Sequence, residues 1–280
     1  MTEKCNLLPL WNAILEIYAE VERICKANGI RFYAGYGTVL GAVRHHGFIP
    51  WDDDFDLIMP FEDYQKFIAI APKALPKHLA LITSDNTPGF PFNSIKVSNL
   101  RRDEVDRVSA ETGHPLAGGI NIDIFPISGV PNKSVGTRLV QSALRCLRNY
   151  RLGTERPTWK SKAAALVGLI LSMIVPGFRT KQDFDSYTES VQRRIPFDVA
   201  ENIGLFDINV MYHKEIAPGQ CFRTVTQMPF QGIQLPVPGD WDCYLKCQYG
   251  DYMTPVRPTV YEYSHGRTRP QAWKYGPTYA

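Results

Sequence analysis

The stretch Gly47–Asp56, GFIPWDDDFD, places four carboxylates within five positions. Neighbouring anions repel one another unless a cation lies among them. On an extended strand alternate side chains share a face, so if extension begins early Asp52, Asp54 and Asp56 can point to one side and Asp53 to the other. Carboxylate oxygens favour a hard ion such as Mg²⁺, Mn²⁺ or Ca²⁺. The pattern therefore predicts a divalent metal site.

Two alternatives compete with this interpretation of the acidic stretch. An EF-hand loop also begins with D-x-D-x-D, but Leu57 and Asp63 occupy the positions where it requires Gly and Glu, which excludes it. A solvated acidic turn is the other alternative. Against it, the apolar stretch Phe55–Met59 leads directly out of the cluster toward buried structure, so we favour metal binding.

The surrounding chain divides into helices and strands that would position these acids. Helices are predicted from Trp11 to the stop at Asn28–Gly29, over Val39–Val43, and from Pro60 to about Ala71. Strands are predicted at Ile30–Tyr33, Phe55–Met59, Leu79–Thr83, Phe92–Ser98, Glu104–Ala110 and Ile120–Phe125. The last alternates cleanly, with Asn121 and Asp123 on one face. This mixture predicts an α+β domain around a sheet.

The middle of the chain has a different composition. Between residues 133 and 181, Glu155 is the one acid, against these basic residues: Lys133, Arg138, Arg145, Arg148, Arg151, Arg156, Lys160, Lys162, Arg179 and Lys181. Within this segment Ala163–Val175 carries no charge, but a bilayer-spanning helix needs about 20 apolar residues. A buried core helix, an interfacial helix on anionic lipid, and a partner or oligomer surface all remain open.

Composition limits the remaining function classes. A net charge of +3 gives no sign of a nucleic-acid partner, and none is expected. The six cysteines are scattered over 280 residues, so we interpret them as reduced thiols. Cys243 and Cys247 could share a metal, but no second Cys/His pair has zinc spacing, and a solvent-shielded structural role is favoured. No secretory signal is evident after Glu3 and Lys4, so we expect a cytoplasmic protein.

The order of parts resembles a known fold. A strand, the small-residue turn Gly35–Thr38, a helix, a paired-Asp strand and a later strand with Asp123 resemble the nucleotidyltransferase fold of the polymerase-β-like superfamily. GTVLGAVRHHGFIPWDDDFDLIMP (Gly37–Pro60), INIDIFPI (Ile120–Ile127) and VPGDWDCYLKCQYGDYMTP (Val237–Pro255) further resemble motifs of the LicD family, the phosphocholine and related phospho-alcohol transferases. Fukutin-type sugar-phosphate transferases are distant relatives of that family.

The resemblance implies metal-dependent transfer of a phospho-alcohol, phosphocholine by default, from a CDP-activated donor to a hydroxyl of a cell-surface glycan, such as lipopolysaccharide or teichoic acid, with release of CMP. Asp54 and Asp56 would be catalytic and hold Mg²⁺ or Mn²⁺ on the diphosphate. Asp52 would complete the metal shell directly or through water. Asp123 would bind a second metal or act as general base.

Further residues are implied in donor binding. Gly37 and Thr38 would contact phosphate at a helix N-terminus, although many helices simply begin after such a turn. Arg44 would fork onto a phosphate oxygen, and His46 is the strongest candidate among the histidines. Lys96 is either a phosphate contact or an edge-strand lysine that reaches solvent. A choline cage from Trp241, Tyr244, Tyr249 and Tyr252 competes with ordinary core packing of these aromatic residues.

These expectations give a domain plan and two rival functions. We expect a nucleotidyltransferase-like core with a mixed sheet over residues 1–132, a basic helical insertion over 133–220 that contacts acceptor or anionic membrane, and a C-terminal segment over 221–280 that packs back on the core. The rival functions are a nucleotidyltransferase that attacks the α-phosphate of an NTP, and a catalytically silent nucleotide-binding relative. A membrane adaptor built on Ala163–Val175 is a remoter alternative.

Overall fold

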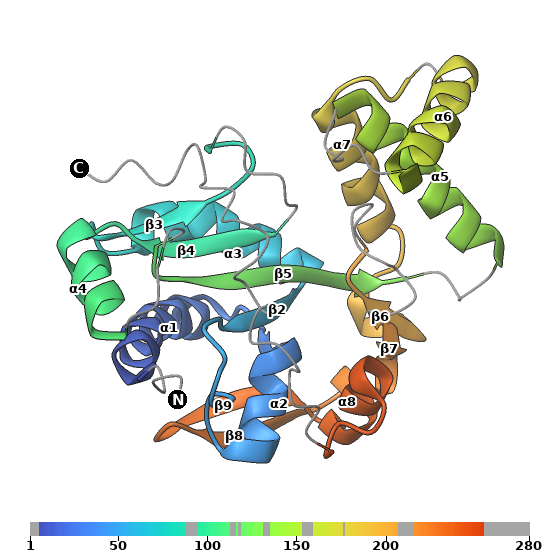
Figure 1. Ribbon diagram of the computed structural model, residues 1–280. Coiled ribbons are helices and arrows are strands. Elements are labelled where there is room, and N and C mark those ends of the chain that lie inside the picture. Colours follow the sequence, from blue (N-terminus) through green and yellow to red (C-terminus); the bar gives the residue numbers. More distant parts are fainter. Residues whose placement is uncertain are drawn as a thin grey trace. The chain divides into compact units, whose positions relative to one another are not determined.

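The computed structural model describes residues 6–87, 94–112, 116, 119–130, 135–152, 159–175, 177–206 and 216–254. These residues form two compact units (Figure 1). The first takes in the chain up to Pro126 and again from Cys221 onward, and the second runs from Ile127 to Gln220. The chain therefore leaves the first unit once and returns to it.

A sheet organises the first unit, with strand order β1 (Tyr33–Ala34), β2 (Asp56–Pro60), β5 (Asn121–Gly129), β4 (Ile95–Asn99) and β3 (Leu79–Ile82). The pairs β1–β2, β3–β4 and β4–β5 are antiparallel. On β5, Ile122 and Ile124 are fully buried on one face, while Asn121 and Asp123 are half-buried on the other. This confirms the predicted alternation and leaves a polar face on the central strand.

Helices α1 (Leu8–Asn28), α2 (Tyr36–His45), α3 (Phe61–Ala74), α4 (Arg102–Thr112) and α8 (Trp241–Tyr249) complete the first unit with the antiparallel hairpin β8 (Val225–Phe230) and β9 (Ile233–Pro238). Helix α1 contacts α3, α4 and β4, and its buried stripe includes Ile14 and Ile17. It ends at Gly29, whose φ of 61° is left-handed, as the predicted helix stop requires. The mixture of helices and strands confirms the α+β expectation.

The second unit contains α5 (Val135–Leu152), α6 (Trp159–Ile174), α7 (Lys181–Gln192) and the short strands β6 (Asn202–Gly204) and β7 (Ile216–Pro218). The last residues of β5 pair with β6, and β6 pairs with β7, both antiparallel. The buried pair Leu147 and Phe184 joins α5 to α7, with Leu171 of α6 packed against it. This unit is mainly helical.

Three local predictions are wrong. Residues Glu104–Ala110 belong to helix α4, not to a strand: Val105 and Val108 are buried one turn apart, and the pairs Arg102–Asp106 and Arg107–Glu111 have helical spacing. The strand expected at Ile30–Tyr33 is confined to Tyr33–Ala34. Strand β2 begins only at Asp56, so the acids before it are not strand residues. The predicted strand Phe92–Ser98 begins outside the described residues, and β4 covers its later part.

Helix α6 corresponds to the uncharged segment and is not a buried core helix. One side packs closely on α5, since a Cβ on Gly168 would lie 2.6 Å from the Cys146 carbonyl oxygen. The other side exposes large apolar side chains: Leu166, Val167, Ile170, Met173 and Ile174. Among the described residues, no helix combines the length and apolar character that crossing a membrane requires.

Candidate active site

The acidic stretch gathers three carboxylates just before β2. One oxygen each from Asp52, Asp53 and Asp54 lies within 4.8 Å of the other two, and all three residues are half-buried. The expectation that Asp53 faces away is wrong, because the alternation rule holds only on a strand. Here the backbone turns, with the Asp52 N–H donating to the Ile49 carbonyl at 2.9 Å. Asp53 therefore joins the candidate metal ligands.

Two further acids of this region lie on strands of the sheet, Asp56 on β2 and Asp123 on β5. The Asp123 N–H donates to the Phe55 carbonyl at 3.0 Å, which ties β5 to the residue just before Asp56. Burial raises the pKa of Asp56 well above its usual value, and the charges of Asp54, Asp123 and Asp52 raise it further, in that order. The structure thus brings acids from two separate segments into one electrostatic cluster.

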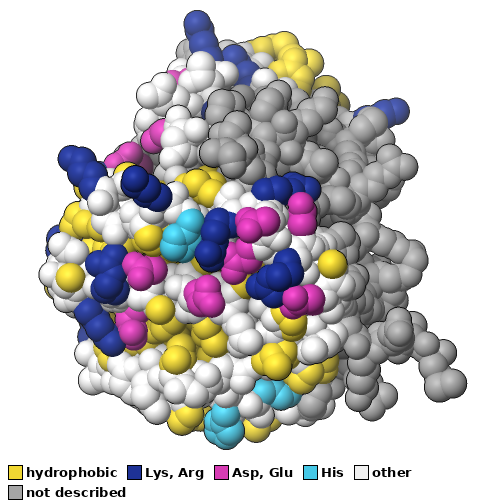
Figure 2. Space-filling model, turned by 90° about the vertical axis from the view of Figure 1, so that its left-hand side faces the viewer, with side chains coloured by type: hydrophobic (Ala, Val, Ile, Leu, Met, Phe, Trp, Pro, Cys, Tyr) yellow, Lys and Arg dark blue, Asp and Glu magenta, His cyan; other side chains and the backbone are white. Residues whose placement is uncertain are grey.

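Lys96 is a cation that contacts this cluster. The register of β4 and β5 places Lys96 opposite Asp123, and its Nζ donates to Asp123 Oδ2 at 2.6 Å and to Asn121 Oδ1 at 2.9 Å. The Lys96 and Asp123 side chains are each 18% exposed. The alternative of an edge-strand lysine is wrong, since β4 lies between β3 and β5. Figure 2 is a space-filling view of the side of the molecule that lies at the left in Figure 1. On this face basic and acidic side chains lie interspersed.

The small-residue turn before α2 lies against the same acids. Thr38 Oγ1 accepts the Asp56 N–H at 2.8 Å, and the Gly35 N–H donates to the Asp56 carbonyl at 2.9 Å. A Cβ on Gly37 would lie 3.0 Å from Asp52 Oδ2. Gly37 and Thr38 are therefore brought together with the carboxylates at the helix N-terminus, where the helix dipole favours an anionic group.

Arg44 and His46 lie at the other end of α2. They follow Thr38 by six and eight residues, or about 9 and 12 Å along a helix axis. Arg44 Nη1 donates to the Tyr252 carbonyl at 3.3 Å, and the His46 carbonyl accepts the Gln231 N–H at 2.9 Å. The described contacts place both residues on the C-terminal part of the first unit, and their roles in donor binding stay predictions.

Several neighbours of the acids escaped the sequence interpretation. The Tyr36 N–H donates to the Tyr244 hydroxyl at 3.2 Å, and the Tyr36 ring meets Phe125 edge-on with 5.4 Å between centroids. Asn121 was detectable, since it alternates with Asp123 on the predicted strand. Tyr244 was considered from the sequence only as a candidate cage residue, and no local pattern indicates its contact with Tyr36, which is 208 residues away in the chain. It is 3% exposed and packs on Phe222, so for this residue core packing is confirmed.

The donor set suits a small hard cation. An octahedral Mg²⁺ with ligands at about 2.1 Å has its most distant oxygens about 4.2 Å apart. Adjacent ligands of such an ion are about 3.0 Å apart, so at least two of the three pairs among Asp52, Asp53 and Asp54, whose oxygens lie within 4.8 Å of one another, must reach that spacing when the ion binds. Sulfur and nitrogen ligands are absent from this set, which favours Mg²⁺ or Mn²⁺ over zinc.

Comparison with known sequences shows which family this part of the chain is similar to. Residues 29–135 match a family model described as LicD/FKTN/FKRP, nucleotidyltransferase domain. This range includes β1 through β5 and every carboxylate of the cluster. Residues 29–135 are thus similar to the LicD family domain, the resemblance that the motifs indicated.

Individual relatives extend the comparison beyond this domain. Over 244 residues, 85% of this chain and 88% of the relative, the chain is 26% identical to a protein named lipopolysaccharide cholinephosphotransferase LicD from Haemophilus influenzae. Uncharacterized proteins of Rickettsia typhi and Rickettsia prowazekii are 36% and 34% identical over 61 residues, which is 22% of this chain and 20% and 23% of theirs. The first of these relatives matches in both units.

Proposed function

We propose that this chain transfers phosphocholine from CDP-choline to a hydroxyl of a cell-surface glycan, with lipopolysaccharide as the first acceptor to test, and releases CMP. The long match to a named lipopolysaccharide cholinephosphotransferase supports the transferred group and the acceptor class. The family description supports a nucleotidyltransferase-like core. The observation that carries the proposal is the convergence of acids from two segments upon one cluster beside a helix N-terminus.

The proposed transfer balances without an added oxidant or reductant. The acceptor oxygen forms a bond to the phosphorus that bears choline, the bond from this phosphorus to the CMP oxygen breaks, and the hydroxyl proton passes to a base. Asp123 is the candidate base, and Lys96 fixes its orientation through the 2.6 Å contact. The N-terminal turn of α2 would orient the diphosphate through its backbone N–H groups.

The carboxylates would hold the metal cofactor of this reaction. Asp52, Asp54 and Asp56 are the predicted ligands, and the geometry adds Asp53 as a further oxygen donor. Bound Mg²⁺ or Mn²⁺ would neutralise charge on the diphosphate as the CMP leaving group departs. Asp123 is the second candidate from β5, either as a ligand or as the base described above.

A product assay tests the donor and the leaving group together. Purified protein is incubated with Mg²⁺, a lipopolysaccharide acceptor and CDP-choline, CDP-ethanolamine, CDP-glycerol or CDP-ribitol, and products are identified by mass spectrometry. We expect phosphocholine on the acceptor and one CMP per transfer. Asp54→Ala and Asp56→Ala should each lower turnover at least about 100-fold, since each removes charge stabilisation at the reacting phosphate. The matched control is Asp85→Ala, an exposed acid on the turn after β3.

Other outcomes of this assay distinguish the rival functions. Pyrophosphate released from an NTP would identify a nucleotidyltransferase instead. Nucleotide binding without any turnover would identify a catalytically silent relative. Equal product from the wild type and both Asp variants would remove the carboxylates from the mechanism.

We also propose that α6 contacts an anionic membrane surface at the cytoplasmic side, where the acceptor precursor would be held. Its exposed apolar side chains, among them Met173 at 73% and Ile174 at 70% exposure, lie in the strongly basic segment between residues 133 and 181. Protein should co-sediment with vesicles that contain phosphatidylglycerol and not with phosphatidylcholine vesicles. Met173→Ser with Ile174→Ser should weaken this binding, and binding unchanged by the pair would refute the contact.

A further inference from the structure

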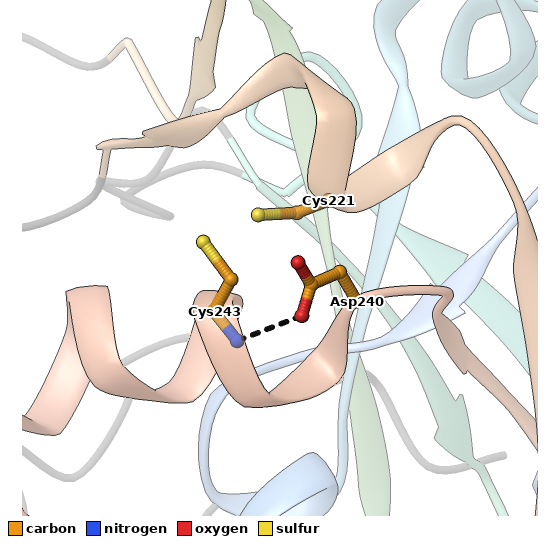
Figure 3. Close-up of side chains that lie close together, drawn as sticks. All are labelled: Cys221, Asp240 and Cys243. Atoms are coloured by element: carbon orange, nitrogen blue, oxygen red, sulfur yellow. Dashed lines mark hydrogen bonds between the residues drawn. The ribbon is translucent and has the colours of Figure 1, made fainter.

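A second cluster of metal-ligating side chains lies in the first unit outside the acidic site. Ligand atoms of Cys221, Asp240 and Cys243 all lie within 4.8 Å of one another. Figure 3 shows the two sulfur atoms and the Asp240 carboxylate directed toward one another. Nothing in the proposed transfer chemistry uses these three residues.

The local fold holds the segments that carry this cluster. Cys221 belongs to the short helix η3 (Gly219–Phe222), and its carbonyl accepts the Asp240 N–H at 3.2 Å. Asp240 is the N-cap of α8, and its Oδ1 accepts the Cys243 N–H at 3.1 Å. A Cβ on Gly239 would lie 1.9 Å from Thr224 Oγ1, so only glycine allows this close approach. The three side chains are thus positioned by backbone contacts.

The donor types select a borderline-soft metal. Zinc binds thiolate sulfur at about 2.3 Å and carboxylate oxygen at about 2.1 Å, which places tetrahedral ligands about 3.6 Å apart. The observed spacing within 4.8 Å therefore needs only a modest contraction. From the sequence, Cys243 and Cys247 were expected to be shielded from solvent. The structure corrects this expectation, because Cys243 is half-buried and Cys247 is exposed.

Cys247 is a candidate fourth ligand of the right type, although its sulfur lies outside the group of atoms within 4.8 Å of one another. It follows Cys243 by four residues on α8, so the two side chains lie on one helix face one turn apart. Cys221, Cys243 and Cys247 form no disulfide bond in this structure. A reactive nucleophilic cysteine is the rival role for the cluster. Cys221 is buried, which shields its sulfur from electrophiles in solution and opposes that role.

We propose that Cys221, Asp240, Cys243 and Cys247 form a structural zinc site that fastens η3 to α8. The site lies next to residues that support the loop before α2. Phe222, adjacent to Cys221, accepts the Tyr33 hydroxyl at its carbonyl at 3.2 Å. Tyr244, adjacent to Cys243, accepts the Tyr36 N–H. Zinc would therefore stabilise the segment that contains Phe222 and Tyr244, which contacts the turn next to the acidic cluster.

Metal analysis of the full-length protein, purified without chelators and supplied with zinc, tests the site. We expect one zinc per chain by elemental analysis, and loss of that zinc in Cys243→Ser and Cys247→Ser. Asp240→Asn should weaken zinc retention against a chelator while keeping the oxygen that caps α8. Cobalt substitution should give a thiolate charge-transfer band that Cys243→Ser diminishes. Folding of each variant is checked by circular dichroism.

Two controls separate this site from the rest of the protein. Cys146→Ser, on α5 in the second unit, should keep the full zinc equivalent. Asp54→Asn should also keep it, because the acidic cluster is a different site. Absence of zinc from the reconstituted wild type, retention of zinc by folded Cys243→Ser, or a Cys221–Cys243 disulfide found by mass spectrometry of the isolated protein would each overturn the proposal.

Discussion

Replacement of Lys96 by methionine tests the electrostatic design of the acidic site. Lys96 Nζ donates to Asp123 at 2.6 Å and to Asn121 at 2.9 Å, and methionine keeps the apolar stem while removing the charge. The variant leaves the Asp123 carboxylate beside Asp54 and Asp56 without its fixed cation. The free energy of unfolding should therefore fall, most strongly when no divalent cation is present.

The magnitude follows from the burial of the pair. Breaking a fully buried ion pair costs about 3–5 kcal/mol, while a charged hydrogen bond contributes about 1.5–3 kcal/mol. Since both side chains keep 18% exposure, we expect a loss of about 2–3 kcal/mol in EDTA. For a chain of this size that loss lowers the Tm by roughly 3–5 °C.

Magnesium should reduce the difference in the free energy of unfolding between Lys96→Met and the wild type. A ligand at 100 times its Kd stabilises a protein by about 2.7 kcal/mol, and the variant should gain more than this because added positive charge replaces the lost ammonium. Thermal and urea unfolding in EDTA and in saturating Mg²⁺ measure the effect. We expect the difference in the free energy of unfolding to shrink by at least about half.

An exposed lysine serves as the matched control. Lys66 also contacts a carboxylate, Asp63, at 3.3 Å, but its side chain is 59% exposed and Arg31 holds the same carboxylate at 2.7 Å. Lys66→Met should therefore cost less than about 1 kcal/mol in either buffer. The reasoning would be refuted if Lys96→Met lost the same free energy of unfolding in EDTA and in Mg²⁺, or lost no more of it than Lys66→Met does.

Three further substitutions test the turn and the cluster. Thr38→Val removes the oxygen that accepts the Asp56 N–H and should cost about 1–3 kcal/mol in urea unfolding, while Thr38→Ser, which keeps the hydroxyl, should cost less. Asp56→Asn should stabilise the protein in EDTA by about 0.5–2 kcal/mol, since a repelled charge is lost, and should still abolish turnover. Gly41→Ala should lower the Tm and cost about 1–3 kcal/mol of the free energy of unfolding, because its Cβ would meet the Gly47 carbonyl oxygen at 2.4 Å. In the control Gly177→Ala the new Cβ has no atom within 4 Å, so the free energy of unfolding should change by less than about 0.5 kcal/mol.

Much of the first unit was accessible from local sequence patterns. The end of α1 at Gly29 and the alternation that places Asp123 on the polar face of β5 both follow from spacing alone. The stretch Glu104–Ala110 was misread because its two valines favour a strand by composition, while their spacing and the flanking ion pairs favour a helix. In that case periodicity was the better guide.

The remaining features depend on contacts between distant parts of the chain. The ion pair of Lys96 arises from the register of β4 on β5, which no local pattern specifies. Asp53 turns toward its neighbours because the backbone bends before β2, so the strand rule fails there. Cys221 meets Cys243 only because a glycine lets two segments approach. Sequence spacing alone supplied none of these three contacts.

Two positive charges would neutralise the acidic site. One is the fixed ammonium of Lys96, and the other is a divalent cation that the carboxylates would bind and release. The β-sheet register places Lys96 opposite Asp123, so we expect their contact to persist when donor binds. Asp52, Asp53 and Asp54 precede β2, and a divalent cation that arrives with the diphosphate would relieve their mutual repulsion. Lys96→Met should then raise the apparent Mg²⁺ affinity measured by calorimetry, whereas Asp54→Ala should lower it. If the two substitutions shift the affinity in the same direction, Lys96 and the metal do not share one cluster of charge.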